Sequence, residues 1–337
     1  GCVERLMMGL KEIKIILGSW DLGRILSHKK TDKGVVNLNW IVRTTKGKYI
    51  LRELGKSKKL KELKFELKYL DYLKRKKFPY KIPSPIKNRK RESFIKKGGS
   101  IFWVYEFIEG RDIKRFGYPE LKECAKMMAI YHQIIENSGI DNKTSYSDFA
   151  REEILEEIKS FQKEIGNSPK DEKEKIFLGE SNKLLPLLNN LNVVGYSKLK
   201  KYSLHRDIGP ENTLWKNKKL VGVIDFENVG EIKDTLIKDL AVMLQYSCRD
   251  KTYKYKLDLK LVKFFLKEYK KHHPLSRTEI SFIPEIIIAG AIEDFSYSYW
   301  MLIHDPERAK LYRLKLYSKV AQWFNQNKNE ILKEITW

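Results

Sequence analysis

The chain has 337 residues, of which 42% are hydrophobic and 12% aromatic, a composition that excludes a disordered chain and allows two compact lobes. Its formal net charge is +23, and the excess is uneven: the first 110 residues hold 28 basic and 11 acidic residues, and the rest hold 39 and 33. A field of this sign attracts polyanions and disfavours cationic ligands, although a lysine-rich composition on ordinary surfaces gives the same totals.

Residues 1–108 are predicted to form a small lobe rich in β-structure around one helix. Alternating segments rich in β-branched residues, on either side of short turns, indicate two hairpins. Their strands are expected at residues 36–45 and 49–54, and at residues 93–95 and 101–108. Apolar residues at helical spacing with a basic outer face predict the helix over residues 58–76, which the following prolines end.

Residues 109–337 are predicted to form a larger, mainly helical lobe, so that the fold class is α+β. Amphipathic periodicity indicates helices over residues 119–135, 148–165, 171–191, 234–246, 257–272, 284–303 and 306–331. Two short β-like pieces, residues 202–215 and 220–226, interrupt this helical part. On the helix 284–303 the aromatic residues are expected to lie in the core, whereas Glu293 and Asp294 face either a substrate cleft or another helix.

Neither a membrane span nor a disulfide-stabilised secreted fold is expected. The nearest candidate span, residues 282–292, is shorter than the ~20 residues needed to cross a bilayer and contains a proline and a glutamate. The N-terminal residues lack the long apolar stretch of a secretory signal. Cys2, Cys124 and Cys248 have neither metal-type spacing nor a disulfide pattern. A cytoplasmic location is the simplest interpretation.

The most informative stretch is HRDIGPEN, residues 205–212, which is followed by Asp225 at the end of a short apolar strand. Phosphoryl transfer needs a carboxylate that orients and accepts the proton of a hydroxyl group, and oxygen ligands for the magnesium ion that bridges the phosphates. Asp207 and Asn212 are five residues apart and can occupy the two ends of one loop. A second Asp on an adjacent strand completes a set of hard oxygen ligands that suits magnesium.

These residues resemble the motifs of the aminoglycoside phosphotransferase superfamily, which includes aminoglycoside kinases, choline kinases, bacterial homoserine kinases and kinase-like spore-coat proteins. The resemblance covers roughly residues 36–246 and implies the bilobal fold of protein kinases. Residues 37–40 and the strand after them resemble the hairpin that covers the nucleotide. The covering loop holds only Gly34, so a glycine-rich phosphate cradle is absent, as it often is in this superfamily.

The resemblance implies a role for each residue of the motif. Asp207 is implied to be the catalytic base, and His205 is implied to shape its loop. Asn212 and Asp225 are implied to hold Mg²⁺. Asp239 resembles a residue that braces the catalytic loop from the following helix, although an acidic residue in a first helical turn also occurs for electrostatic reasons alone.

Four residues of the first lobe are implied to bind ATP. Arg52 falls where many relatives carry a lysine that pairs with the phosphates, and its guanidinium fork can also grip phosphate. Glu66 resembles the helical glutamate that pairs with that cation, although an ordinary ion pair would look the same. Glu106 and Ile108 lie in a segment that resembles the hinge, whose backbone would bind adenine.

Three functions are compatible with these observations. The first is an ATP- and Mg²⁺-dependent phosphotransferase that acts on a hydroxyl of a small metabolite. The positive charge counts against cationic acceptors such as aminoglycosides and choline, and is compatible with neutral or anionic ones. The second is a kinase that acts on, or docks to, RNA. The third is a non-catalytic kinase-like structural protein, against which the intact set of Asp207, Asn212 and Asp225 argues.

The RNA hypothesis depends on the basic first lobe. Its cations cluster at Lys56, Lys58 and Lys59, at Lys74–Lys77, and at Lys87, Arg89, Lys90 and Arg91. Binding through such clusters would depend strongly on salt, because each neutralised phosphate releases counterions. No recognised RNA-binding module accompanies these clusters.

Overall fold

The computed structural model describes residues 8–31, 37–55, 58–140 and 148–337, so Cys2, Gly34 and Lys56 lie outside the described residues. The chain divides into two compact units. The first comprises Gly1–Asp112 and Asn212–Glu231, and the second comprises Ile113–Glu211 and Ile232–Trp337. Residues 212–231 therefore pack with the first unit, although the predicted lobes, 1–108 and 109–337, assigned them to the second.

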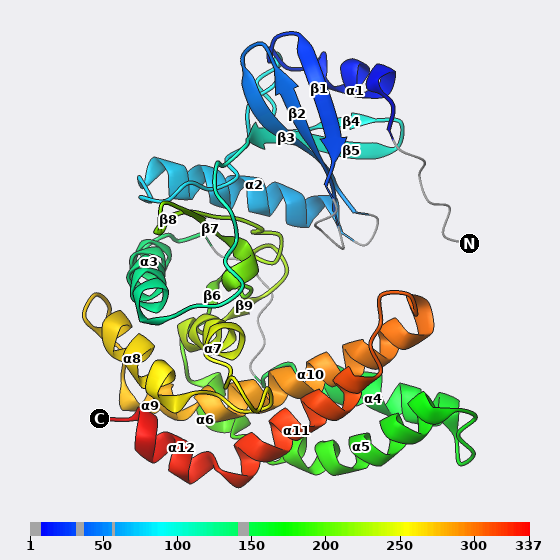
Figure 1. The fold of residues 1–337 in the computed structure, drawn as a ribbon, viewed down its shortest axis with the longest axis vertical. Coiled ribbons are helices and arrows are strands. Elements are labelled where there is room, and N and C mark those ends of the chain that lie inside the picture. Colours follow the sequence, from blue (N-terminus) through cyan, green and yellow to red (C-terminus); the bar gives the residue numbers. More distant parts are fainter. Residues whose placement is uncertain (1–7, 32–36, 56–57, 141–147) are drawn as a thin grey trace. The chain divides into compact units, whose positions relative to one another are not determined.

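The first unit contains an antiparallel sheet of five strands in the order β1-β2-β3-β5-β4 (Figure 1). The strands are β1 (Ile25–Lys30), β2 (Leu38–Thr44), β3 (Gly47–Glu53), β4 (Ile95–Lys97) and β5 (Ser100–Glu106). Both predicted hairpins are confirmed, because Thr44 pairs with Gly47 and Lys97 pairs with Ser100 at their turns. Neither β1 nor the short helix α1 (Leu10–Leu17) was predicted.

The two faces of this sheet carry different chemistry. One face packs against α1 in a core that includes Ile13, Ile16, Trp20, Trp40, Val42, Leu51, Phe102 and Val104. Successive side chains of a strand point to opposite faces. Arg52 on β3 and Trp103 on β5, which follow Leu51 and Phe102, therefore lie on the other face, where they are paired across the two strands. The alternation thus brings a buried cation to the face away from α1.

Helix α2 (Leu60–Arg75) has an apolar stripe that contains one carboxylate. Leu63, Leu67, Leu70 and Leu73 are buried at helical spacing, and Glu66 is buried among them. The chain approaches this helix closely at Gly230, where an added Cβ would lie 2.7 Å from the backbone oxygen of Glu62. A side chain at that position would push residues 225–231 away from α2, so the glycine allows the contact.

A short hairpin completes the first unit. Strands β7 (Thr213–Lys216) and β8 (Lys219–Val223) pair antiparallel, and Arg111 bridges to Trp215. Gly110 and Gly222 allow close packing here, since an added Cβ would lie 3.1 Å from Leu214 Cβ and 3.0 Å from Ile108 Cγ2, respectively. The segment that resembles the hinge therefore packs directly against this hairpin.

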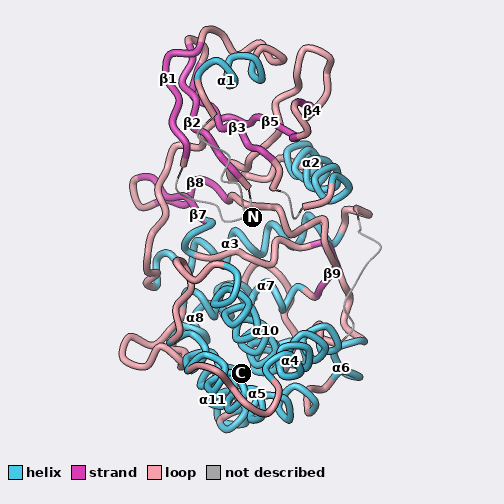
Figure 2. Tube along the Cα trace, turned by 90° about the vertical axis from the view of Figure 1, so that its right-hand side faces the viewer, coloured by secondary structure: helices cyan, strands magenta, loops and turns pink. Residues whose placement is uncertain are grey.

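The second unit is mainly helical (Figure 2). Its helices are α3 (Tyr118–Glu136), α4 (Arg151–Ile165), α5 (Glu172–Asn189), α6 (Val193–Ser197), α7 (Leu236–Ser247), α8 (Leu259–Lys270), α9 (Arg277–Ser281), α10 (Ile283–His304), α11 (Tyr312–Gln326) and α12 (Lys328–Ile335). Helix α10 packs against α4, α5, α7 and α11, and α3 packs against α8. A two-residue ladder joins β6 (Tyr202–Ser203) to β9 (Lys233–Asp234).

Two predicted elements are wrong in extent. Over the predicted helix 306–331, residues 306–311 are not helical, and the rest is divided between α11 and α12, which meet at Asn327. The predicted β-like piece 202–215 is two short strands, β6 and β7, separated by the loop that carries the HRDIGPEN motif. Sequence periodicity could not reveal either break, because apolar residues continue on both sides of it.

The aromatic residues of α10 fall into two groups. Phe295 and Tyr299 are buried and stack on Phe177 with ring centroids 5.0 and 4.1 Å apart, as expected for core residues. Tyr297 and Trp300 are exposed and stack on each other. By length and composition, residues 277–304 could cross a membrane, but most of this region is buried inside the unit, as in the core helix of a folded domain.

Cys124 and Cys248 are buried free thiols, and burial raises the pKa of both. A buried, protonated thiol is a poor nucleophile and a poor metal ligand. These two cysteines thus have the structural role expected from their scattered positions.

Gly230→Ala is expected to lower the free energy of unfolding by roughly 1–3 kcal/mol, because the new Cβ would overlap the backbone of α2 at Glu62. The matched control is Gly179→Ala in α5, where an added Cβ meets nothing within 4 Å. This control is expected to raise stability by about 0.5–1 kcal/mol, since alanine is the better helix former. Urea unfolding measures both, and a gain in both variants would contradict the close contact at Gly230.

Candidate functional site

Arg52 connects three segments of the first unit. Its Nε donates a hydrogen bond to Asn39 Oδ1 on β2 at 2.9 Å. Its Nη2 donates to Asp225 Oδ1, just beyond β8, at 3.3 Å. Its Nη1 lies 3.7 Å from Glu66 Oε1 on α2. The structure thus brings together three residues that the sequence assigned separately to phosphate binding, to the helix and to the metal.

The cluster holds more carboxylates than its cations can neutralise. Burial opposes the charge of Arg52, but Tyr105, Asp225 and Glu66 outweigh this effect and raise its pKa. Burial raises the pKa of Glu66 to about 7, because one guanidinium shared among several acids offsets too little of the desolvation. Burial, with the charge of Asp225, likewise raises the pKa of Glu227 to about 7. A bound cation would relieve this excess of negative charge.

Two polar atoms of this cluster are buried without a hydrogen-bond partner among the described residues. They are Nη1 of Arg52 and Oε1 of Glu66, the two atoms that face each other at 3.7 Å. Buried polar atoms are rarely left unpaired, because each one costs about 1–3 kcal/mol. An anionic oxygen within reach of Nη1 would satisfy the guanidinium, which is the geometry that a phosphate group offers.

Asn212 and Asp225 flank the open end of the β7–β8 hairpin. Asn212 lies in the 3₁₀ turn Pro210–Asn212 before β7, and its backbone oxygen accepts a hydrogen bond of 3.0 Å from Ile224 N. Asp225 follows Ile224 with a left-handed backbone, φ +68°, and its side chain is 30% exposed. The hairpin therefore holds the two predicted metal ligands at neighbouring positions, and the Asp225 carboxylate remains accessible.

The donors present fit a hard, partly hydrated cation. Among the residues that the structure describes, no three His, Cys, Asp or Glu side chains gather into a metal-binding group. Magnesium does not need such a cage, because it keeps several waters and takes one or two carboxylates together with phosphate oxygens. A carboxylate and an amide at the end of one hairpin match that requirement.

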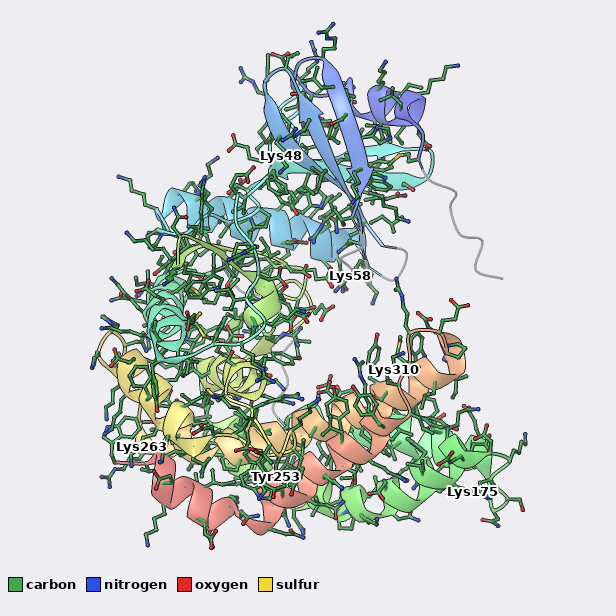
Figure 3. All side chains as sticks on the ribbon, in the orientation of Figure 1. Lys48, Lys58, Lys175, Tyr253, Lys263 and Lys310 are labelled. Atoms are coloured by element: carbon green, nitrogen blue, oxygen red, sulfur yellow. The ribbon has the colours of Figure 1, made fainter. Side chains whose placement is uncertain are left out.

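Sequence reasoning missed Glu227 and its surroundings. Asn37 donates to Glu227 through Nδ2, and Asn37 Oδ1 accepts from Gly55 N at 2.9 Å. Lys58, which Figure 3 labels, lies 3.9 Å from Glu227 Oε1 and 2.5 Å from Glu231 Oε1. The Asp-x-Glu spacing of residues 225–227, directly after an apolar strand, was the available signal.

In the second unit, the loop that carries Asp207 is held by a buried carboxylate. Arg206 has a left-handed backbone, φ +58°, and its N–H donates to Asp239 Oδ1 at 2.6 Å. His205 is fully buried, and its Nδ1 accepts from Asp207 N at 3.3 Å. Asp239 thus braces the loop from α7, as the resemblance implied, by fixing the strained residue next to Asp207.

The second oxygen of Asp239 reaches a residue that the sequence did not single out. His132 on α3 lies with Nε2 3.3 Å from Asp239 Oδ2 and Nδ1 2.8 Å from the hydroxyl of Tyr269 on α8. All three side chains are buried. A lone histidine on the apolar face of a predicted helix gives no distinguishing signal, so only the tertiary structure could reveal this network.

The predicted hinge continues directly from β5. Glu106, the last residue of that strand, pairs with Tyr49, and Phe107 N donates to Lys48 O at 2.9 Å. The side chain of Glu106 is exposed, and that of Ile108 is buried close to Gly222. Since one side chain is exposed and the other is packed against the hairpin, any part that these two residues play in adenine binding would belong to their backbones.

Comparisons with known proteins give the family and the fold of the chain. A profile of the phosphotransferase enzyme family matches residues 28–260. A homoserine kinase from Bradyrhizobium sp. (strain ORS 278) is 25% identical over 284 residues, which cover 83% of this chain and 82% of that protein.

Solved structures share the fold at low sequence identity. A microcompartment-associated aminopropanol kinase is 13% identical with a TM-score of 0.69, and covers 96% of this chain and 98% of its own. A spectinomycin phosphotransferase, solved with ADP and spectinomycin, is 15% identical with a TM-score of 0.67, and covers 96% and 97%. These similarities show the bilobal kinase-like fold that the sequence predicted.

Asp239→Asn is expected to lower the free energy of unfolding by about 1–3 kcal/mol, because the amide keeps one acceptor for Arg206 N but loses the charge that faces His132. Tyr269→Phe removes only the hydroxyl at His132 Nδ1 and is expected to cost less. Denaturant unfolding of the two single variants and the double variant forms the test. A coupling of at least about 0.5 kcal/mol is expected for members of one network, whereas additive losses would contradict it.

Proposed function

The chain belongs to the phosphotransferase enzyme family, and we propose that it transfers the γ-phosphate of ATP, with Mg²⁺, to a hydroxyl of a small neutral or anionic metabolite. The observation that carries this proposal is the cluster of Arg52, Glu66 and Asp225. In this cluster Arg52 has one N–H donor without a hydrogen-bond partner, and it lies beside the carboxylate of Asp225, which remains accessible. Such a pairing suits a phosphate chain with its metal ion.

The proposal gives Asp207 the role of the base that orients the acceptor hydroxyl and takes its proton as the new ester bond forms. His205 supports this role indirectly, since it lies buried beneath the loop and accepts from Asp207 N. The brace from Asp239 keeps the loop in one conformation before any substrate arrives. Fixed positioning of this kind contributes much of the rate in phosphoryl transfer, because the protein has little covalent chemistry to perform.

In this proposal Arg52 binds the phosphates of ATP, and Glu66 orients Arg52. The backbone at Glu106 and Ile108 receives adenine, in keeping with their position at the end of β5. Asn212 and Asp225 hold Mg²⁺, whose positive charge offsets the charge that develops on the transferred phosphoryl group. Arginine in place of the common lysine adds a second fork nitrogen, so Asp225 and a phosphate oxygen can be bound by different atoms.

Small hydroxyl compounds are the favoured acceptors because several similar proteins are named for substrates of this kind. Homoserine kinases and an aminopropanol kinase are named for substrates of this size. A metabolic role of this kind fits the expected cytoplasmic location. The structural-protein alternative is disfavoured by the buried ionic cluster around Arg52, which a purely structural copy of the fold would not need to keep.

RNA docking is a second candidate, supported by one groove in the first unit. The groove has a volume of about 680 Å³ beside α2. Its basic residues are Lys64, Lys68, Lys74, Arg75, Lys87 and Arg91. Asp71 and Glu92 are its acidic residues, and Leu67 and Phe94 line its apolar part. A row of cations with one aromatic ring is the arrangement that single-stranded nucleic acid favours.

The basic clusters of the sequence contribute unequally to this groove. Lys58 does not belong to it, because it pairs with Glu231 and Glu227. Lys87 is partly neutralised by Asp71 at 3.4 Å. Arg91 is presented by a turn in which Asn88 Oδ1 accepts from two backbone N–H groups, so its position is defined. The groove thus contains only some of the basic residues of the first lobe, but these residues line one defined surface.

Asp207→Asn is expected to reduce ATP turnover with an acceptor by at least about 100-fold and to leave Mg-ATP affinity nearly unchanged, because the amide keeps the size but accepts no proton. Asp225→Asn is expected to weaken Mg-ATP binding instead, because it removes a metal ligand. Thermal shift and calorimetry measure binding, and a coupled assay measures turnover. Asp305→Asn, a loop aspartate of the second unit, is the control. Equal loss of nucleotide binding in both variants would contradict this division of roles.

Replacing Lys64, Lys68, Lys74 and Arg91 with Glu is expected to abolish any RNA retention at low salt and to leave Mg-ATP affinity unchanged. The control reverses four exposed lysines of the second unit, Lys122, Lys126, Lys159 and Lys163, and so makes the same change in net charge. Filter binding to single-stranded RNA and to heparin measures retention, whose salt slope should be about 0.7 log units per contact. Equal losses in both sets, or no retention by the unaltered protein, would reject the groove as an RNA site.

A further inference from the structure

The turn after β8, residues 225–231, begins with an unfavourable backbone conformation. Asp225 has φ +68°, in the left-handed region that residues other than glycine seldom adopt unless nearby contacts hold them. On the side of the hairpin, Ile224 N donates to Asn212 O at 3.0 Å and fixes the residue before Asp225. The conformation of Asp225 therefore depends on what holds the chain after it.

After Asp225, the turn is attached to the sheet through Glu227. Its Oε2 accepts a hydrogen bond from Asn37 Nδ2. Asn37 is 4% exposed and directly precedes β2, and its Oδ1 accepts from Gly55 N at 2.9 Å, just beyond β3. One asparagine thus uses its donor and its acceptor to join Glu227 to the paired ends of β2 and β3.

The far end of the turn is attached to α2. Lys58, whose side chain is 10% exposed, lies 2.5 Å from Glu231 Oε1 and 3.9 Å from Glu227 Oε1. Gly230 passes close to the backbone of Glu62, in the first turn of α2. Contacts with the sheet and with α2 therefore hold residues 227–231 in place beside the strand that carries Arg52.

Asp225 and Glu227 differ in what their carboxylates can still bind. The Asp225 side chain is 30% exposed, and its Oδ1 accepts from Arg52 at 3.3 Å. The Glu227 side chain is 16% exposed, and its two oxygens face Asn37 and Lys58. A magnesium ligand must offer an oxygen to a partly hydrated ion. Asp225 meets this requirement better, whereas Glu227 is engaged with the protein.

We propose that Glu227 is a positioning residue for the metal site, which acts by holding Asp225 in place through the hydrogen bond with Asn37. The inference rests on the proposed function, because Asp225 is a magnesium ligand within it. Without this bond, residues 225–231 can leave the conformation that presents the Asp225 carboxylate, so Mg-ATP binds more weakly. The transfer step itself is expected to change little, because Glu227 has no part in the proton transfer to Asp207.

An exchange of donor and acceptor tests the hydrogen bond. In Asn37→Asp two carboxylates face each other, and the Kd for Mg-ATP is expected to rise roughly 10-fold or more. Glu227→Gln keeps an acceptor for Asn37 and is expected to change the Kd by less than about 3-fold. In the double variant the introduced amide donates to the introduced carboxylate, which still accepts from Gly55 N, so the Kd should return to within about 3-fold of its original value. A Kd no lower than that of Asn37→Asp alone would overturn the inference.

The same variants separate positioning from metal binding. If Glu227 bound Mg²⁺ itself, Glu227→Gln would weaken Mg-ATP binding as much as Asp225→Asn does, and the double variant would recover nothing. That result would also overturn the inference, and it stays decisive even if Asn37→Asp does not fold. In steady state, the loss in Asn37→Asp should appear in the KM for Mg-ATP with kcat changed by less than about 3-fold, whereas partial unfolding would lower kcat.

Asn88→Asp is the matched control in the same unit. Asn88 is 6% exposed, its Nδ2 donates to Glu92 Oε2 at 3.1 Å, and its Oδ1 accepts from Lys90 N and Glu92 N. The substitution also makes two carboxylates face each other, but in a different turn of the chain. It is expected to lower thermal stability and to leave the Kd for Mg-ATP unchanged. An equal loss of affinity in Asn88→Asp and Asn37→Asp would reduce the effect to general destabilisation and contradict the inference.

Hydrogen exchange in the nucleotide-free protein gives a readout that does not depend on Mg-ATP. The amides of residues 225–231 and of Gly55 are expected to exchange faster in Asn37→Asp than in the unaltered protein, and to be protected again in the double variant. If the unaltered protein binds no Mg-ATP, the proposed function fails. If it binds Mg-ATP but exchange at residues 225–231 is the same in all variants, only the positioning inference fails.

Discussion

The first unit depends on one buried positive charge. Arg52 is 7% exposed, and its guanidinium reaches a strand, a helix and the turn after a hairpin. A buried guanidinium without carboxylates would be strongly unfavourable, so the three segments cannot separate without exposing or orphaning it. Residues 212–231 come from a distant part of the sequence, yet they pack with the N-terminal unit because this charge, together with the close contact at Gly230, requires them there.

The second unit depends in the same way on one buried carboxylate, that of Asp239. It is fully buried, and its two oxygens face Arg206 N and His132 Nε2. The first contact holds a left-handed residue, which costs about 1–3 kcal/mol if nothing compensates. The loop before Asp207 is therefore kept in an unfavourable backbone conformation by a group that is itself stable only while this loop and His132 remain in place. Fold and loop geometry are stabilised by the same contacts.

The sequence predicted local features better than tertiary ones. Alternation predicted β2, β3 and β5, and helical spacing predicted α2, because these patterns are set by neighbours in the chain. The motif at residues 205–212 likewise uses neighbours in the chain, and the roles that it assigns to Asp207 and Asn212 stay predictions. His132, Glu227 and the break at Asn327 were missed, since each depends on a partner distant in sequence. Glu293 and Asp294 looked alike in sequence, but in the structure Glu293 is exposed and Asp294 is partly buried.

Charged side chains contribute to stability differently in the two units. Around Arg52, most opposite charges meet within 4 Å, and the segments that carry them are held together. In the second unit, the partly buried side chain of Asp294 on α10 forms no ion pair within 4.0 Å among the described residues. Ion pairing thus stabilises the first unit at Arg52, whereas an unpaired, partly buried carboxylate is a cost that the packing of α10 against its neighbouring helices must offset.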